Sequence, residues 1–374
     1  MNIDLRENRK KLYNKLLSIN SIDSLMEFQI ELSKEIQNTE RTLKSEKKEE
    51  LKRHIHLLKC YGDSCAWMFL HPHSIRQLYK NEKNKGYLID QGKAFENTIN
   101  LARDVIAKLN LPVLIADLTH CINIGDLIIC SDPEVPEIIE CKSGMKNNKY
   151  TMQGRRGRQL SRMKGTKEYL KKGQAKVYGE IKERLCLELE LTANHNWNIV
   201  NSVLRETEKV GQSFYKLSEY EIIGAILDEI EMKIEEHLQP CEFSFKNPIV
   251  ASHYRAVKEA WPTFAPPVMW NIDKHFKFKL MEGEIMLFHV FDPIALLGFT
   301  NGSATITKID VPIAGTTDQG YEIEINHDQK WILSSVFTDK ILYGYETVDS
   351  VGNSMLESSQ KATEKVWELS EKNS

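Results

Sequence analysis

Residues 91–142 constrain the fold of this chain more than any other part of the sequence. An apolar pattern of helical spacing covers 91–109 and ends before Pro112. Three short β-like runs follow at 113–118, 122–130 and 137–142, and the last two are separated by turn-forming residues. A helix followed directly by consecutive strands predicts an α/β unit, inside a chain that is α+β overall.

The sections on either side have different patterns. We expect an N-terminal helical section over 1–74, made of two long amphipathic helices that break near residues 20–23, where Ser24 and Glu27 have capping-box spacing. The α/β core is expected over 75–195. Helical patterns over 175–191 and 218–238 predict a helical connector at 196–240.

The composition shifts toward β-branched and aromatic residues after Pro240. This shift predicts a β-rich C-terminal domain over 241–374 that selects the substrate or a partner and ends in a helix near 354–370. Its expected strands are 276–280, 284–291, 304–311, 321–325, 331–337 and 341–346.

The composition is that of a globular chain. Of the 374 residues, 41% are hydrophobic and 28% are charged, with a net charge of −3, so extensive disorder is excluded. No run reaches 18 apolar residues and the first residues are polar, so we expect a cytoplasmic protein that makes no membrane contact. Seven cysteines without a CxxC pair are expected to be reduced thiols.

Positive charge is concentrated in one segment, residues 142–176. It contains twelve Lys and Arg residues, and Glu168 is its only carboxylate. A solvated helix surface usually mixes both signs, so this imbalance favours phosphate binding, which gives salt-sensitive affinity without reading bases. A helix over 157–172 is predicted to carry most of the charge.

Asp126, Glu140 and Lys142 form the constellation that can carry chemistry. Alternation along a strand projects Glu140 and Lys142 from one face, while Ile139 and Cys141 point to the core. If the two strands pair as a hairpin, Asp126 stands beside Glu140. Two carboxylates suit Mg²⁺ or Mn²⁺, which lowers the pKa of bound water, and Lys142 adds a positive charge where negative charge develops.

The order of these elements, a helix followed by the strands and then the basic helix, resembles that of the PD-(D/E)XK, or restriction-endonuclease-like, nuclease superfamily over residues 90–190. The signature residues are Asp126 and Glu140-Cys141-Lys142, with Glu96 in a Gly-x-x-x-Glu element on the preceding helix and Gly125 in the place of the motif's Pro. The resemblance implies a core with a mixed sheet flanked by helices. It also implies a metal held by Asp126, Glu140 and the Cys141 carbonyl, with Glu96 in support.

The resemblance further implies a Mg²⁺-dependent endonuclease that hydrolyses phosphodiester bonds, in DNA rather than RNA, with a role in restriction or antiviral defence. Double-stranded DNA is the expected partner, and a homodimer or partner protein is compatible with the long helices. The residues expected to contact nucleic acid are Gln153, Arg155, Arg156, Arg158, Gln159, Arg162 and Lys164. Alternatives are a non-catalytic nucleic-acid-binding or assembly module, or a nuclease subunit that needs a partner or an activator.

Plainer interpretations stay open for several of these residues. Asp126, Glu140 and Lys142 could form a surface hairpin with an ion pair of little energetic value. Glu96 could be a solvated helix residue, and Glu137 is more simply a charge at the start of a strand. The aromatic residues after position 260 are more simply core than a base-stacking platform.

A run of histidines and cysteines lies near the end of the N-terminal section: His54, His56, Cys60, Cys65, His71 and His73. No pair has CxxC or HxxxH spacing, and His54 and Cys60 do not project together from a helix, so we expect no zinc site there. Residues 62–67 are interpreted as a helix-packing segment with a small-residue contact.

Overall fold

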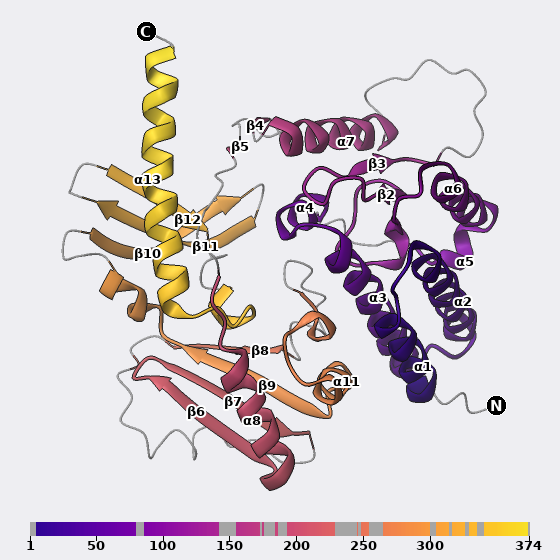
Figure 1. Ribbon diagram of the computed structural model, residues 1–374, viewed down its shortest axis with the longest axis horizontal. Helices are drawn as coiled ribbons and strands as arrows, with labels where there is room; N and C mark the ends of the chain where they lie inside the picture. Colours follow the sequence, from indigo (N-terminus) through magenta and orange to yellow (C-terminus); the bar gives the residue numbers. More distant parts are fainter. Residues whose placement is uncertain are drawn as a thin grey trace. The chain divides into compact units, whose positions relative to one another are not determined.

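The computed structural model divides the chain into two compact units, Met1–Leu185 with Val257–Trp270, and Cys186–Ala256 with Asn271–Ser374 (Figure 1). Each unit contains helices and antiparallel strands, so the expected α+β class is confirmed. The structure describes residues 5–79, 86–141, 155–172, 174–175, 184–185, 193–228, 245, 248–253, 265–299, 304–313, 316–325, 329–334 and 340–372.

The first unit begins with three helices, α1 (Leu5–Leu17), α2 (Ile22–Glu46) and α3 (Glu49–Phe69). The predicted break near residues 20–23 is confirmed, but Ser21, rather than Ser24, is the N-cap of α2 and accepts a hydrogen bond from the Ser24 amide. A second break was not predicted. Lys47 ends α2 in the left-handed region (φ 52°), so the expected second long helix is a pair of helices.

These helices pack against one another through aliphatic side chains at helical spacing, among them Leu16, Leu32, Ile36 and Leu58, which are fully buried. Burying such a side chain contributes about 1.5–3 kcal/mol, so the apolar stripe read in the sequence accounts for the contact. The short helices α4 (Pro72–Leu78) and α5 (Leu88–Gln91) follow.

The predicted helix over 91–109 is confirmed as α6 (Lys93–Leu109). The strands after it are shorter than expected: β1 (Val113–Ile115), the 3₁₀ turn η1 (Ala116–Leu118), β2 (Leu127–Ile129) and β3 (Glu137–Ile139). They form a sheet of order β1-β2-β3 in which both pairs are antiparallel. All strand pairs among the described residues are antiparallel, so the expected mixed sheet is not observed there.

The basic helix is confirmed as α7 (Arg155–Lys172), which packs against β3 and α4. The helical pattern over 175–191 is wrong at the described positions. There, β4 (Gln174–Ala175) pairs with β5 (Arg184–Leu185).

The second unit contains the largest correction. After α8 (Trp197–Val210), residues expected to be helical form the hairpin β6 (Gln212–Ser218) and β7 (Glu221–Leu227), so the expected helical connector is wrong over 212–227. Gly211, with φ 92°, ends α8, and the β-branched run of β7 is almost wholly buried. A continuous apolar run of this length is typical of a central strand and has no helical stripe.

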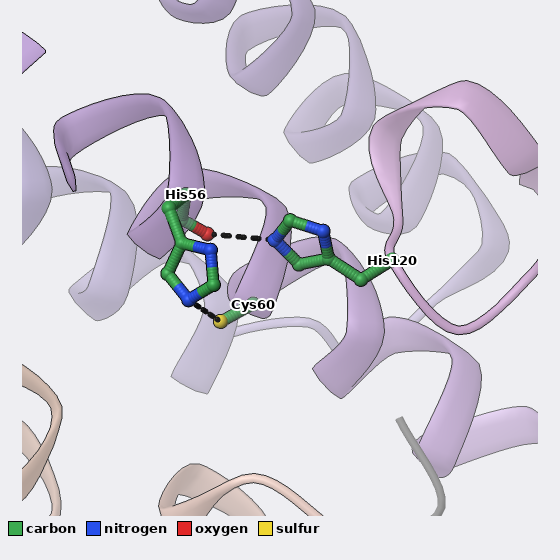
Figure 2. A group of neighbouring side chains, drawn as sticks. All are labelled: His56, Cys60 and His120. Atoms are coloured by element: carbon green, nitrogen blue, oxygen red, sulfur yellow. Dashed lines mark hydrogen bonds between the residues drawn. The ribbon is translucent and has the colours of Figure 1, made fainter. Parts of the chain in front are cut away.

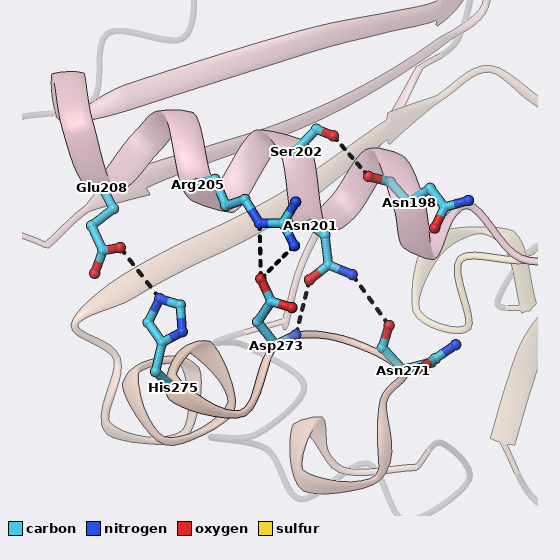
Figure 3. Close-up of polar contacts among 8 residues, drawn as sticks. All are labelled: Asn198, Asn201, Ser202, Arg205, Glu208, Asn271, Asp273 and His275. Atoms are coloured by element: carbon cyan, nitrogen blue, oxygen red, sulfur yellow. Dashed lines mark hydrogen bonds and ion pairs between the residues drawn. The ribbon is translucent and has the colours of Figure 1, made fainter.

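A four-stranded antiparallel sheet of order β6-β7-β9-β8 results, with β8 (Ile249–Ser252) and the predicted strand β9 (Ile285–Phe291). The strand expected at 276–280 is wrong, because these residues lie in α11 (Lys274–Glu282). Phe276 and Leu280 lie one turn apart and both are fully buried. Side chains of α8 bond the segment before α11: Asn201 accepts from the Asp273 amide, and Arg205 forms an ion pair with Asp273 (Figure 3).

The remaining elements are the 3₁₀ turns η2 (Pro267–Met269) and η3 (Pro293–Phe299), and the antiparallel sheet of β10 (Ala304–Ile313), β11 (Thr316–Ile325) and β12 (Gln329–Ser334). These three strands confirm the predictions there. The terminal helix is confirmed as α13 (Val348–Lys372). The strand expected over 341–346 is wrong, because Ile341 and Leu342 are helical and only Glu346 forms a bridge, with His195.

Candidate functional site

The hairpin expected to carry the carboxylates is formed by β2 and β3. Leu127 pairs with Ile139, and the Asp126 amide donates a hydrogen bond of 2.8 Å to the Ile139 carbonyl, so Asp126 lies at the end of β3 that Glu140 follows. The Cys141 amide donates to Oδ2 of Asp126 at 2.6 Å. The hairpin therefore brings together the two carboxylate residues that the sequence singled out.

Gly125 makes this arrangement possible. Its φ is 80°, and a Cβ there would collide with the side chain of Ile138. A proline ring fixes φ near about −65°, so the Pro of the family motif would not fit this backbone. The departure from the motif is thus required by the local conformation.

The environment of Asp126 is partly buried and acidic. Burial raises the pKa of Asp126, and the charge of Asp117 raises it further, while the hydrogen bond from the Cys141 amide lowers it. Asp117 lies in η1, directly after β1, and accepts a hydrogen bond of 3.1 Å from Gln91. The sequence analysis missed Asp117, although its position at the end of a β-like run was a usable signal.

The expected alternation fails at the end of β3. Ile138 is buried and Ile139 is only half-buried, so Ile139 is not the core residue that the pattern predicted. Glu140 and Cys141 are also half-buried, because the strand ends at Ile139 and the alternation ends with it. Glu137 is an exposed charge at the strand start, as its simpler interpretation had it.

The helix before the hairpin contacts it through Thr98 rather than Glu96. The side chains of Thr98 and Cys141 form a hydrogen bond, and Phe95, Thr98 and Ala102 make up the buried face of α6. Glu96 is exposed, two positions from Thr98 and hence on another face of the helix. The structure therefore supports the solvated interpretation of Glu96, and its predicted role in the metal shell stays a prediction.

The predicted nucleic-acid contacts are only partly described. Lys142 and Gln153 lie outside the described residues, and the side chains of Arg155, Arg156, Arg158 and Gln159 are not described although these residues belong to α7. Arg162 is half-buried and Lys164 is exposed. Thr166 and Tyr169 are buried on the inner side of the helix, and the Tyr169 ring lies 5.6 Å from that of His73.

Among the described residues, one group of three His, Cys, Asp or Glu side chains offers ligand atoms within 4.8 Å of one another. It is formed by His56, Cys60 and His120, and not by the carboxylates around Asp126. The sequence analysis named His56 and Cys60 without expecting a site. It missed the group because His120 follows in a separate segment and completes no local motif.

The comparisons with known proteins add no family. No protein-family model, no curated protein and no solved structure matches this chain. In the part of the chain that the structure describes, no helix combines the length and the apolar character needed to span a membrane.

Proposed function

We propose that this protein is a metal-dependent nuclease whose site is the β2–β3 hairpin. The observation that carries the proposal is the pairing of β2 with β3, since Asp126 directly precedes β2 and Glu140 directly follows β3 at the same end of the hairpin. The basic helix α7 packs against the same strand, β3, which supports a role for its cations at this hairpin. The proposal includes a restriction-endonuclease-like fold for the core that contains this hairpin.

The donor set fits Mg²⁺. This ion is commonly bound through one or two carboxylates while waters and substrate phosphate oxygens complete its shell, so Asp126 and Glu140 suffice as side-chain ligands. Burial and the charge of Asp117 both disfavour the charged form of Asp126, and a nearby divalent cation would offset both effects. When bound, the ion would neutralise phosphate oxygens and lower the pKa of a bound water.

The chain's own groups would then each have a separate role. The Cys141 amide fixes the orientation of the Asp126 carboxylate through its 2.6 Å hydrogen bond. Lys142, the residue after Cys141, would stabilise the charge that develops on the phosphate or orient the attacking water. The cations of α7 would hold the backbone phosphates, without reading bases. DNA is the proposed substrate and RNA is the alternative.

Cleavage assays on supercoiled plasmid, linear duplex, single-stranded DNA and RNA, with Mg²⁺, Mn²⁺ or chelator, test the proposal. Asp126→Asn keeps an oxygen that can accept from the Cys141 amide but removes the charge, and we expect it to lower the cleavage rate by about 100- to 1,000-fold or more. Lys142→Ala should have a comparable effect. Asp104→Asn, an exposed residue of α6, is the matched control.

Full cleavage by Asp126→Asn would overturn the assignment of the site. The basic charge of residues 142–176 favours one other function, a nucleic-acid-binding module without catalysis. Binding that falls with salt and persists in chelator, with no cleavage of any of the four substrates, would favour that module.

A further inference from the structure

Three side chains from two distant segments converge beside α3 in the first unit (Figure 2). His56 and Cys60 belong to α3, and His120 comes from the loop that follows η1. Sγ of Cys60 lies 3.8 Å from Nε2 of His56, and the ring centroids of the two histidines lie 4.7 Å apart. The three side chains thus direct two imidazoles and one thiol toward a common point.

The two residues of α3 are neighbours because of their spacing. Positions four apart on a helix lie on one face, one turn above the other. Cys60 is buried and His56 is half-buried, so this face of α3 is turned toward the interior of the unit and not toward solvent.

His120 is held in place by two features of the next turn of α3. Oδ1 of Asp63 accepts hydrogen bonds from the backbone amides of His120 and Cys121, at 2.7 and 2.8 Å. At Gly62, a Cβ would collide with the carbonyl oxygen of Leu118, so the absence of a side chain lets the loop approach the helix. Both contacts fix the backbone of the third residue before any ligand binds.

We propose that His56, Cys60 and His120 bind one Zn²⁺ ion. Imidazole and thiolate are the ligands that zinc prefers, whereas Mg²⁺ prefers oxygen, so this centre differs in chemistry from the carboxylate hairpin. Zinc bonds of about 2.0–2.3 Å place tetrahedral ligand atoms roughly 3.3–3.6 Å apart. The 3.8 Å between Cys60 and His56 already approaches this spacing.

The third ligand is also close to its required position. A ring nitrogen of His120, Nε2, lies 3.1 Å from the backbone carbonyl of His56. This nitrogen is the one that faces His56 and Cys60 (Figure 2), so binding the ion would exchange its contact with the carbonyl for a bond to the metal. Three protein ligands leave a fourth coordination position for water. The ion would also link α3 to the loop that contains His120.

The test uses the full-length protein after removal of metals with a chelator, with Zn²⁺ or Co²⁺ alone as the probe. We expect one Zn²⁺ per chain by metal analysis and isothermal titration. Co²⁺ should give a cysteinate-to-cobalt charge-transfer band and the visible bands of a tetrahedral site. Since loss of an outer partner of a zinc ligand lowers affinity about 10- to 100-fold, His120→Ala and Cys60→Ser should lower it at least that much.

Matched controls separate ligand loss from general damage. Cys65→Ala changes another buried cysteine of α3, and His275→Ala changes an exposed histidine of the second unit; both should keep the affinity and the cobalt spectrum. A wild-type cobalt spectrum without the cysteinate band would overturn the proposal even if the variants misfold. So would equal Zn²⁺ affinity in wild type and His120→Ala. Neither readout depends on nuclease activity.

Discussion

The two compact units use buried polar side chains differently. In the first unit, such side chains bind the backbone of segments far away in sequence: Gln29 of α2 bonds to Val113 and Ile115 of β1, and Asp63 of α3 bonds to residues 120 and 121. In the second unit, several of them lie within or beside the regular sheet: His289 of β9 bonds to Glu221 of β7, 2.9 Å apart.

The difference teaches which contacts position a site. Gln29 takes the role of a neighbouring strand, because its amide both donates to and accepts from the outer strand of the β1-β2-β3 sheet. Asp63 likewise bonds to the backbone of the loop that contains residues 120 and 121. The irregular segments of the first unit thus depend on a few side chains, whereas the sheet of the second unit has a continuous ladder of backbone hydrogen bonds. Single substitutions should therefore cost more in the first unit.

The largest effect is expected for Asp63→Ala. The substitution leaves the amides of His120 and Cys121 without their carboxylate acceptor, and a hydrogen bond to a charged group is worth about 1.5–3 kcal/mol. We expect the free energy of unfolding to fall by about 3 kcal/mol in urea denaturation. Asp63→Asn keeps an acceptor oxygen and should lose less. Equal losses in the two variants would contradict the role given to Asp63.

Gln29→Leu should have the next largest effect. The leucine fills similar space but leaves the Val113 carbonyl and the Ile115 amide without the amide side chain that bonds to both. Each buried group left unsatisfied costs about 1–3 kcal/mol, so we expect a loss of roughly 2 kcal/mol and faster hydrogen exchange at Ile115. Glu27→Leu, an exposed change on the same helix, is the control. Unchanged exchange at Ile115 would mean that Gln29 does not protect the strand.

A smaller, pH-dependent effect is expected at His253 in the second unit. Nδ1 lies 2.8 Å from both the amide and the carbonyl of Leu287, and Nε2 faces the Leu280 carbonyl. Burial lowers the pKa of His253 and outweighs the two carbonyls, which raise it. Below the unfolded-state pKa of about 6.5, the unfolded chain takes up a proton that the folded one resists, so stability is lost as the pH falls.

Urea denaturation of wild type and His253→Gln at about pH 7.5 and about pH 5.5, either side of the histidine pKa, measures this effect. We expect the difference between the two pH values to be larger in the wild type. The same difference in both proteins would assign the acid sensitivity to other groups.

The smallest effect is expected for Arg205→Ala, in the contact between α8 and the segment before α11 (Figure 3). The ion pair of Arg205 with Asp273 is 2.8 Å long but exposed, and such pairs are worth about 0.2–1 kcal/mol. Asn201→Ala removes the acceptor of the Asp273 amide and should cost more than Arg205→Ala in the same thermal unfolding series. The reverse order would show that the surface charge dominates this contact.

Local patterns predicted much of the secondary structure, and their failures share a physical cause. The helix α6 follows from apolar periodicity that its own residues carry, and the strand β9 follows from its run of apolar and aromatic residues. Residues 276–280 alternate like a strand but bury Phe276 and Leu280 one turn apart, and residues 222–227 are apolar throughout. Short apolar runs fit either state, so packing against the rest of the unit decides between them.

The two candidate sites also differ in how much of each can be predicted from local sequence. The sequence by itself predicted that Asp126 and Glu140 lie at the same end of one hairpin, because the two strands are close in the chain and pair with each other. It also determined that His56 and Cys60 share a helix face. Only the tertiary structure brought in His120, which lies 64 residues beyond His56. Such contacts depend on Gly62 and Asp63 joining a loop to a helix, and no local pattern encodes that approach.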